Sequence, residues 1–246
     1  MPLSHAAQTA RVRLAQVRGQ LTEVARQLNE DLGAANSYRD DYLSQAGLDA
    51  KRRELAGEAR DRHQDSLEKL ARAISYDVSI VRESVNSSRP AIGSDAAALM
   101  RSQMKWDQVR MRLQSGMPMT RVLATADTET ALAIREWAPA WLEAQSYEVA
   151  PNGSGLADVP AVDVDGLLRS VDDRLAAQSV DFAEVVKASR QVEEIAAAAE
   201  PTLGYLTQRL SGGPSDGLAA AIASHSAAAR ATRPFVEPPQ PAEVTA

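Results

Sequence analysis

The sequence predicts an all-α protein: a long N-terminal helical hairpin or coiled coil, then a helical bundle, and shorter C-terminal helices with a disordered proline-rich tail. Three observations support this fold class. Alanine, the strongest helix former, accounts for 45 of the 246 residues. Apolar residues recur at alternating spacings of three and four along the first third of the chain. Residues that cap or break helices separate the remaining apolar segments at helix length.

The first predicted helix carries a heptad repeat from Ala7 to Leu28, with charged and amide side chains at the other positions. Such a pattern buries a narrow apolar stripe against another helix. The repeat stops at Asp31, and Gly33 is the predicted helix end. The predicted interface positions of this first seam are Leu14, Val17, Leu21, Val24 and Leu28.

A second predicted helix starts after Ser44, which is a favourable N-cap, and runs to about Asn86. Leu43 and Leu48 flank the cap at the spacing of a hydrophobic staple. A helix of about 40 residues is roughly 60 Å long and needs a partner. Two partners remain open: the first helix of the same chain, or the same helices of another copy. The predicted interface positions of this second seam are Leu67, Ala71, Ile74, Val78, Val81 and Val85.

The middle of the chain contains two further predicted helices. Ser94 is the predicted cap of the first, which ends at Gly116. Its predicted common face consists of Leu99, Trp106, Val109 and Leu113.

Asp127 is the predicted cap of the second, which runs to about Gln145 and should kink or restart at Pro139. Trp137 and Trp141 lie four residues apart and therefore on one face of this helix. Packing in the core, with Trp106 nearby, is favoured over a ligand platform, because an aromatic-poor chain needs bulky residues to close its core.

The C-terminal part is acidic and alanine-rich: residues 148–246 hold 14 acidic and 7 basic side chains. Helices are predicted over about 163–178, about 181–199, where Pro201 ends the run, and about 216–230. The predicted domain organisation is a hairpin-plus-bundle domain over 1–147, a flexible linker over 148–162, an acidic helical region over 163–232 and a disordered tail over 233–246.

Composition limits the functional classes. The absence of Cys excludes disulfides, thiolate nucleophiles and zinc sites with sulfur ligands. No apolar run approaches the roughly 18 residues that span a bilayer, and the first residues lack the pattern of a signal peptide. We therefore expect a protein with no membrane contact in the cytoplasm, or in a virion if it is phage-encoded.

Motifs for catalysis or metal binding are missing from the sequence. The histidines His5, His63 and His225 lie far apart, and no phosphate-binding or dinucleotide-binding glycine loop occurs. Asp163 begins a weak calcium-loop pattern, but the twelfth position is Arg174 instead of Glu, so a helix cap is the better interpretation. We predict no catalytic residue, no cofactor and no metal site.

Two alternative functions depend on particular residues. A nucleic-acid-associated regulator would use the basic face over residues 51–62, namely Lys51, Arg52, Arg53, Arg60 and Arg62. Neighbouring acidic residues make a solvated helix face the favoured interpretation, and nucleic acid an unfavoured partner. A helical enzyme or ligand binder would require a pocket beside the paired tryptophans.

Three segments carry a weak resemblance to a known group of proteins. They are Tyr42-Leu43-Ser44-Gln45-Ala46-Gly47, Trp106-Asp107-Gln108-Val109-Arg110, and Ala131 to Leu142 after Ala126-Asp127. Residues 38–147 resemble helical proteins of unassigned role encoded in phages and prophages of high-GC actinobacteria. Together with the heptad seams, the resemblance implies a non-enzymatic structural or assembly protein, scaffold-like or virion-associated, that acts through coiled-coil contacts. The expected partner is another copy or another assembly protein.

Overall fold

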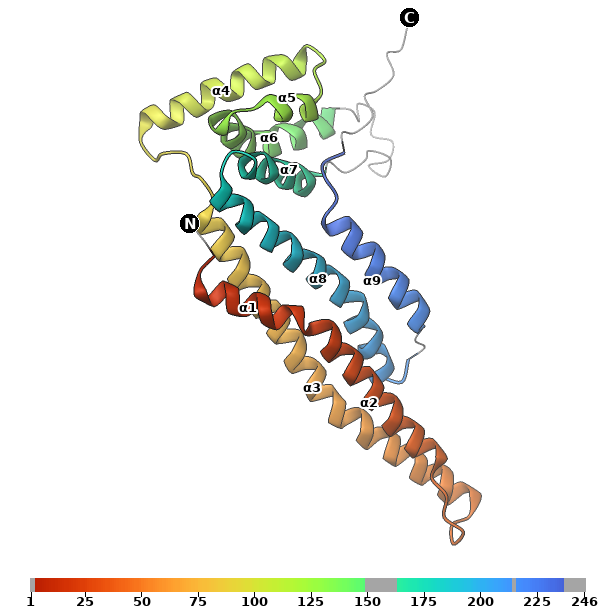
Figure 1. The fold of residues 1–246 in the computed structure, drawn as a ribbon. Helices are drawn as coiled ribbons and strands as arrows, with labels where there is room; N and C mark the ends of the chain where they lie inside the picture. The colour runs from red at the N-terminus through yellow and green to blue at the C-terminus, as the bar shows by residue number, and fades with distance from the viewer. Residues whose placement is uncertain (1–2, 149–162, 214–215, 237–246) are drawn as a thin grey trace, which may run out of the picture. The chain divides into compact units, whose positions relative to one another are not determined.

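The computed structural model describes residues 3–148, 163–213 and 216–236. Within these ranges the chain is helical apart from its connections and contains no strand, which confirms the all-α fold class. The described residues form two compact units, and neither unit is one continuous stretch of sequence (Figure 1). Unit 1 comprises residues 88–148, 163–186 and 233–236, and unit 2 comprises residues 3–87, 187–213 and 216–232.

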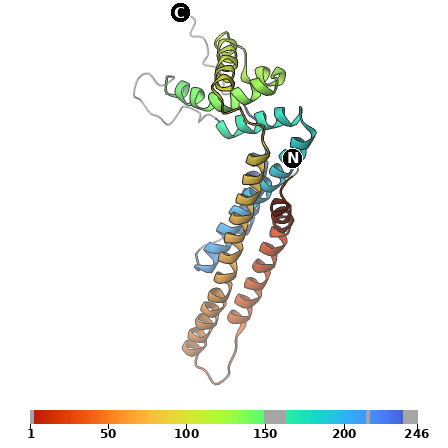
Figure 2. The ribbon, with the colours of Figure 1, turned by 90° about the vertical axis from the view of Figure 1, so that its left-hand side faces the viewer.

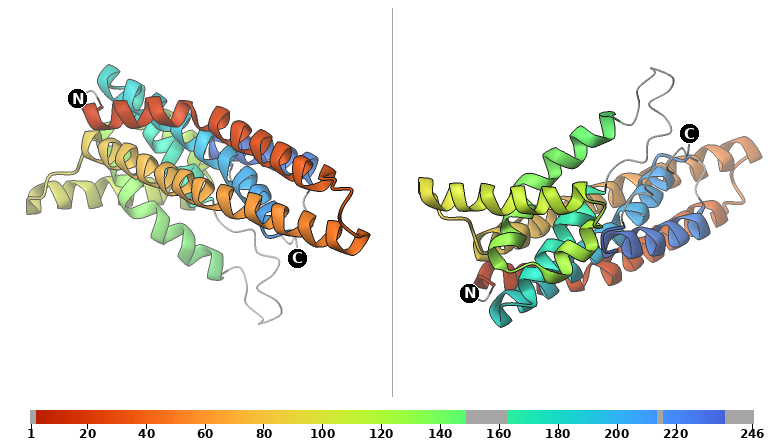
Figure 3. Two further views of the ribbon diagram at one scale, coloured as in Figure 1. Left: turned by 90° about the horizontal axis from the view of Figure 1, so that it is seen from below. Right: turned by 90° about the horizontal axis from the view of Figure 1, so that it is seen from above.

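Unit 2 contains the predicted N-terminal hairpin. Its arms, α2 (Val17–Ser37) and α3 (Gln45–Ser88), run antiparallel and are joined by residues 38–44 (Figure 2). Tyr42 in this connection is 99% exposed. The greater part of α8 (Val180–Leu210) lies beside α3, and α9 (Gly217–Ala231) lies beside α8 (Figure 3). The long helix α3 is therefore covered from within its own chain.

A short helix, α1 (His5–Ala15), precedes the hairpin and packs on the C-terminal half of α3. The Arg13 guanidinium forms a bidentate ion pair with Asp77, in which Nε donates to Oδ2 at 2.9 Å. The Asp77 side chain is only 5% exposed, and a buried carboxylate requires such a partner. These contacts hold α1 on α3, although the helix is interrupted at Gln16 before α2 begins.

Two predicted helix ends in unit 2 are wrong. Gly33 lies inside α2, which continues to Ser37, and Pro201 lies inside α8, which continues to Leu210. An interior glycine costs a helix about 1 kcal/mol and a proline about 3 kcal/mol. Burial of apolar residues beyond each position offsets these costs, as at Ala35 and Leu206.

Unit 1 is a small bundle of α4 (Ala96–Gln114), α5 (Met119–Thr125), α6 (Thr128–Glu148), α7 (Val164–Ala176) and the first two turns of α8. Every one of these elements contributes fully buried side chains, which include Val109, Val122, Ile134, Leu167, Val171 and Val185. Helix α6 runs on through Pro139, so it does not restart there, and the alternative of a kink at Pro139 stays a prediction.

Gly116 makes the sharp turn from α4 towards α5. Its φ of +87° lies in the left-handed region that glycine adopts at no steric cost. The turn allows the Met117 N–H to donate to the Arg112 carbonyl at 3.0 Å, which satisfies an acceptor at the end of the helix. The predicted end of this helix at Gly116 is therefore confirmed.

The predicted helix caps are mostly confirmed. Side-chain oxygens of the predicted caps Ser44, Asp127 and Asp163 each accept a hydrogen bond from a backbone N–H in the first turn of the following helix. Asp216, which was not predicted as a cap, does the same for α9. The cap of α4 is Asp95 instead of the predicted Ser94, with Oδ1 accepting from the Ala98 N–H at 2.8 Å. A negatively charged carboxylate also interacts favourably with the helix dipole at the N-terminus, whereas a neutral hydroxyl does not.

Asp127 provides a pH-dependent prediction. Hydrogen bonds from Thr130, and a further one from Lys105, lower the pKa of Asp127 from 3.8 to about 2. Because the folded pKa is lowered, the stabilisation is present above pH 3.8 and is lost as the pH falls towards 2. We expect Asp127→Ala to lower the free energy of unfolding by about 1 kcal/mol at pH 7. Urea titrations of both proteins should converge near pH 2, and a constant difference would contradict the assignment.

The domain organisation differs from the prediction. The sequence places the hairpin and residues 91–147 in one domain, whereas the structure places them in different units, because α8 returns to pack beside α3. The predicted linker and most of the predicted tail lie outside the described residues. Residues 233–236 are ordered on α7: Phe235 is 5% exposed, and its N–H donates to the Ser170 hydroxyl at 3.0 Å.

Candidate protein-docking surfaces

The two predicted coiled-coil seams lie inside unit 2. All of the predicted interface positions are buried except Val24 and Ala71, which are half-buried. The most enclosed are Leu14, Leu28 and Val81, each with no exposed surface. A seam that is closed within one chain is not available to another copy. Any contact with another molecule must therefore use a different surface.

A buried histidine, His63, lies next to these seams. The His63 Nε2 atom makes a 2.9 Å hydrogen bond with Asp31 Oδ2, which joins α3 to α2. Sequence spacing gave no signal for this pairing, since the two residues lie on different helices. No group of three metal-ligating side chains occurs among the described residues.

The basic face over residues 51–62 is partly neutralised by the chain itself. Lys51 forms a 3.0 Å ion pair with Glu54, which raises the pKa of Lys51. Arg52 donates to the Tyr38 carbonyl at 3.0 Å, and Arg62 lies 3.6 Å from Asp31. Arg60 packs against the turn at Gly212, 3.6 Å from the position that a Cβ would occupy there. Lys51, Arg52 and Arg62 are thus paired with carboxylates, whereas Arg53 and Arg60 form no ion pair with a described residue, so at most two cations of this face are left for a phosphate backbone.

Trp106 lies in the core of unit 1, whereas the core position predicted for Trp137 is wrong, since Trp137 lies at the edge. Trp106 of α4 meets Trp141 of α6 edge to face, with ring centroids 5.9 Å apart and an interplanar angle of 75°. Trp137 is 37% exposed, and its Nε1 donates to the buried Ser102 hydroxyl at 3.2 Å. The expected proximity of Trp106 is confirmed, and this geometry is that of packed rings joining two helices.

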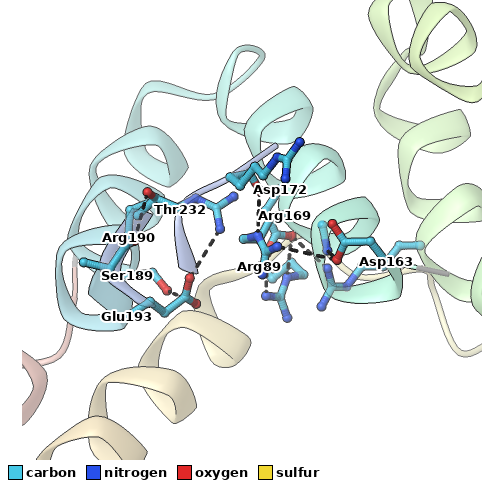
Figure 4. Close-up of polar contacts among 12 residues, drawn as sticks. Arg89, Asp163, Arg169, Asp172, Ser189, Arg190, Glu193 and Thr232 are labelled. Atoms are coloured by element: carbon cyan, nitrogen blue, oxygen red, sulfur yellow. Dashed lines mark hydrogen bonds and ion pairs between the residues drawn. The ribbon is translucent and has the colours of Figure 1, made fainter. Parts of the chain in front are cut away.

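An arginine–aspartate cluster lies in unit 1 and was not predicted from the sequence. Arg89 forms a bidentate pair with Asp172 at 2.9 and 3.0 Å, and Arg135 donates to the same carboxylate at 2.9 Å (Figure 4). Burial lowers the pKa of the Arg135 guanidinium, and Asp172 partly opposes that shift. Arg169 and Asp163 lie 3.6 Å apart close by. The carboxylates of Asp163 and Asp172 are both paired with arginine, so the cluster joins α6 to α7 by ion pairs.

A groove of about 970 Å³ runs between α3 and α8 in unit 2. Its lining includes the apolar residues Ile74, Val78 and Leu203. Its charged residues are Arg82, Glu83 and Glu200. Hydroxyl groups of serine make up most of the remaining polar lining. No group of potential metal ligands belongs to it, so the groove offers apolar surface more than chemistry.

A row of exposed methionines occupies the outer side of α4. Met100, Met104 and Met111 are 66%, 61% and 60% exposed, and we call these three residues the methionine face. The opposite side of α4 packs into unit 1 through four buried residues: Ala98, Ser102, Trp106 and Val109. Leu99, predicted for that packed side, is instead 50% exposed. The methionine spacing of four and seven residues is the signal in the sequence for this face.

Helix α9 has an unusual distribution of side chains. None of its residues is buried, although it lies beside α8. Thr202 and Ser224 share a 3.0 Å hydrogen bond between the two helices, and the half-buried side of α9 consists of alanine and serine. Leu218 and Ile222, its largest apolar side chains, are 72% and 59% exposed. We call these two residues the α9 stripe.

No helix in the described part of the chain combines the length and the apolar character needed to cross a membrane. Comparison with protein-family models, curated proteins and solved structures gave no match to this chain. The resemblance to helical phage proteins therefore stays a prediction, and the two exposed apolar surfaces carry the functional interpretation.

Proposed function

We propose that the protein is a non-enzymatic helical assembly protein that acts through protein–protein contacts and self-associates through the α9 stripe. One observation carries the proposal: α9 buries none of its own residues and directs its leucine and isoleucine to solvent. The seams that suggested coiled-coil contacts are closed within the chain, so contact with another copy must use an exposed surface, and we assign it to the α9 stripe.

The stability of α9 supports this choice. A helix of 15 residues is marginal in water unless a face of it is packed, and alanine contributes little apolar area. Burying Leu218 and Ile222 would contribute about 1.5–3 kcal/mol for each side chain. An antiparallel pair of α9 helices from two copies brings both residues into contact with their counterparts across a two-fold axis.

The wider role we propose is the assembly of a phage particle, as a scaffold-like or virion-associated protein in the host cytoplasm or the virion. The support for this role is the weak resemblance over residues 38–147, the excess of 23 arginines over 4 lysines that suits a GC-rich genome, and the extended hairpin of α2 and α3.

The test is the solution mass of the full-length protein, measured by light scattering behind a sizing column over a concentration series. We expect a dimer or larger species whose mass falls towards that of one chain on dilution. Ile222→Glu should abolish self-association, because the substitution would place a charge without a partner in the contact.

Met104→Glu is the matched control, since it places the same charge on an exposed apolar position of the other unit. It should leave the mass unchanged. A wild-type protein that is a monomer at every concentration would contradict self-association, and equal dissociation by both variants would contradict the role of α9.

A further inference from the structure

The methionine face of α4 requires its own explanation, because it belongs to the other unit and to a helix that is already packed. Met100, Met104 and Met111 lie within about 40° of one another around the helix, at 100° per residue, and span eleven residues, or about 16 Å. Each is at least 60% exposed. Apolar rows of this kind on a surface helix mark contact sites, and methionine is enriched at interfaces because its flexible thioether adapts to its partner.

The edges of the methionine face differ in charge. Arg101, Gln108 and Arg112 follow one edge, at the spacing of seven and four residues that keeps them in line. Neither guanidinium forms an ion pair or side-chain hydrogen bond with another described residue. The opposite edge is neutralised, because Asp107 and Arg110 form an ion pair at 3.0 Å. The face therefore presents an apolar row with two unpaired positive charges on one side.

We propose that the methionine face binds an acidic amphipathic helix of another protein. The apolar stripe of such a helix would cover the methionines, and carboxylates eleven residues apart would meet Arg101 and Arg112. In this mode of recognition, apolar side chains one and two turns apart on the bound helix make the main contacts. The proposal goes beyond self-association, since it assigns a second partner to a different unit.

A second copy of α4 is a poor occupant of the same face. An antiparallel pair related by a two-fold axis brings the Arg101 and Arg112 edges of both copies together, and like charges at close range disfavour the pair. In a parallel pair, the arginine edge of one copy would lie beside Asp107 of the other. The Asp107 carboxylate already forms an ion pair with Arg110 and so offers little charge to a second arginine. Charge complementarity thus selects a carboxylate-rich partner.

The test uses the full-length protein and a labelled synthetic peptide, observed by fluorescence anisotropy. The probe is an amphipathic helix with leucines at positions i, i+4, i+7 and i+11 and glutamates along both edges. The reference peptide carries lysines in place of the glutamates. We expect saturable binding of the acidic peptide, at least about tenfold tighter than binding of the basic one.

Two variants locate the site. Met104→Glu should weaken acidic-peptide binding at least about tenfold, and Arg101→Glu with Arg112→Glu should reverse the preference towards the basic peptide. Arg18→Glu with Arg82→Glu makes the same change in net charge at exposed positions of unit 2 and should change little.

Three outcomes would overturn the proposal: no saturable binding of the acidic peptide, equal binding of both peptides, or binding that the α4 variants leave unchanged. Association with anionic lipid vesicles that competes with the acidic peptide would assign the face to a membrane surface and also overturn it. Ile222→Glu should alter the solution mass and leave peptide binding intact, so failure of self-association and failure of this proposal give different results.

Discussion

Replacing Asp172 with alanine is expected to lower the free energy of unfolding of unit 1 by about 3–5 kcal/mol. The side chains of Arg89 and Asp172 are 14% and 15% exposed, and that of Arg135 is 24% exposed. Without the carboxylate, the guanidinium groups of Arg89 and Arg135 would lose the ion pairs that they share at a site with little access to water. The expected loss reflects the cost of leaving these mostly buried cations without Asp172 more than the net value of the ion pairs themselves.

Tryptophan fluorescence in a urea titration measures this change in the correct unit, because all three tryptophans lie in unit 1. Glu136→Ala removes an exposed carboxylate next to Arg135 and should change the free energy by no more than about 0.5 kcal/mol. A loss below about 1 kcal/mol for Asp172→Ala would show that water already satisfies the two arginines.

Trp106→Ala should destabilise unit 1 by about 3–5 kcal/mol. Trp106 is 6% exposed and packs against Trp141, so truncation leaves a cavity between α4 and α6. Hydrogen exchange read by mass spectrometry suits this variant, since it follows the amides of both helices without depending on a tryptophan. Exchange in α4 and α6 should accelerate strongly.

Trp137→Ala is the matched comparison. Its ring is 37% exposed, and its removal forfeits one hydrogen bond to Ser102, so the expected loss is only about 1–2 kcal/mol. Equal losses in the free energy of unfolding for both substitutions would contradict the assignment of Trp106 to the core and of Trp137 to its edge.

Local features of the fold followed from the sequence with few errors. Heptad spacing identified the hairpin, and the caps at Ser44, Asp127 and Asp163 were predicted because a capping oxygen acts within three residues of itself. Gly33 and Pro201 were assigned as helix ends because local propensity favours that role. Burial beyond them, which depends on distant helices, overrides the preference.

Non-local pairings could not be predicted in the same way. The association of α3 with α8 joins residues more than a hundred positions apart, and the arginine–aspartate cluster joins Arg89 to Asp172 across 83 positions. Neither leaves a spacing pattern in the chain. The methionine face and the α9 stripe were not predicted for a related reason. The sequence pattern indicates that one side of a helix is apolar, but not whether another part of the chain covers that side.

The connection at residues 38–44 joins the two arms of the hairpin at a point where Tyr42 is almost fully exposed. Added residues there would displace no packed side chain. Their main cost is the entropy of closing a longer loop, about 0.6 kcal/mol for each doubling of its length. The hairpin tip is thus the place where this chain can gain sequence, such as a displayed epitope or a fused domain, while the helices keep their register.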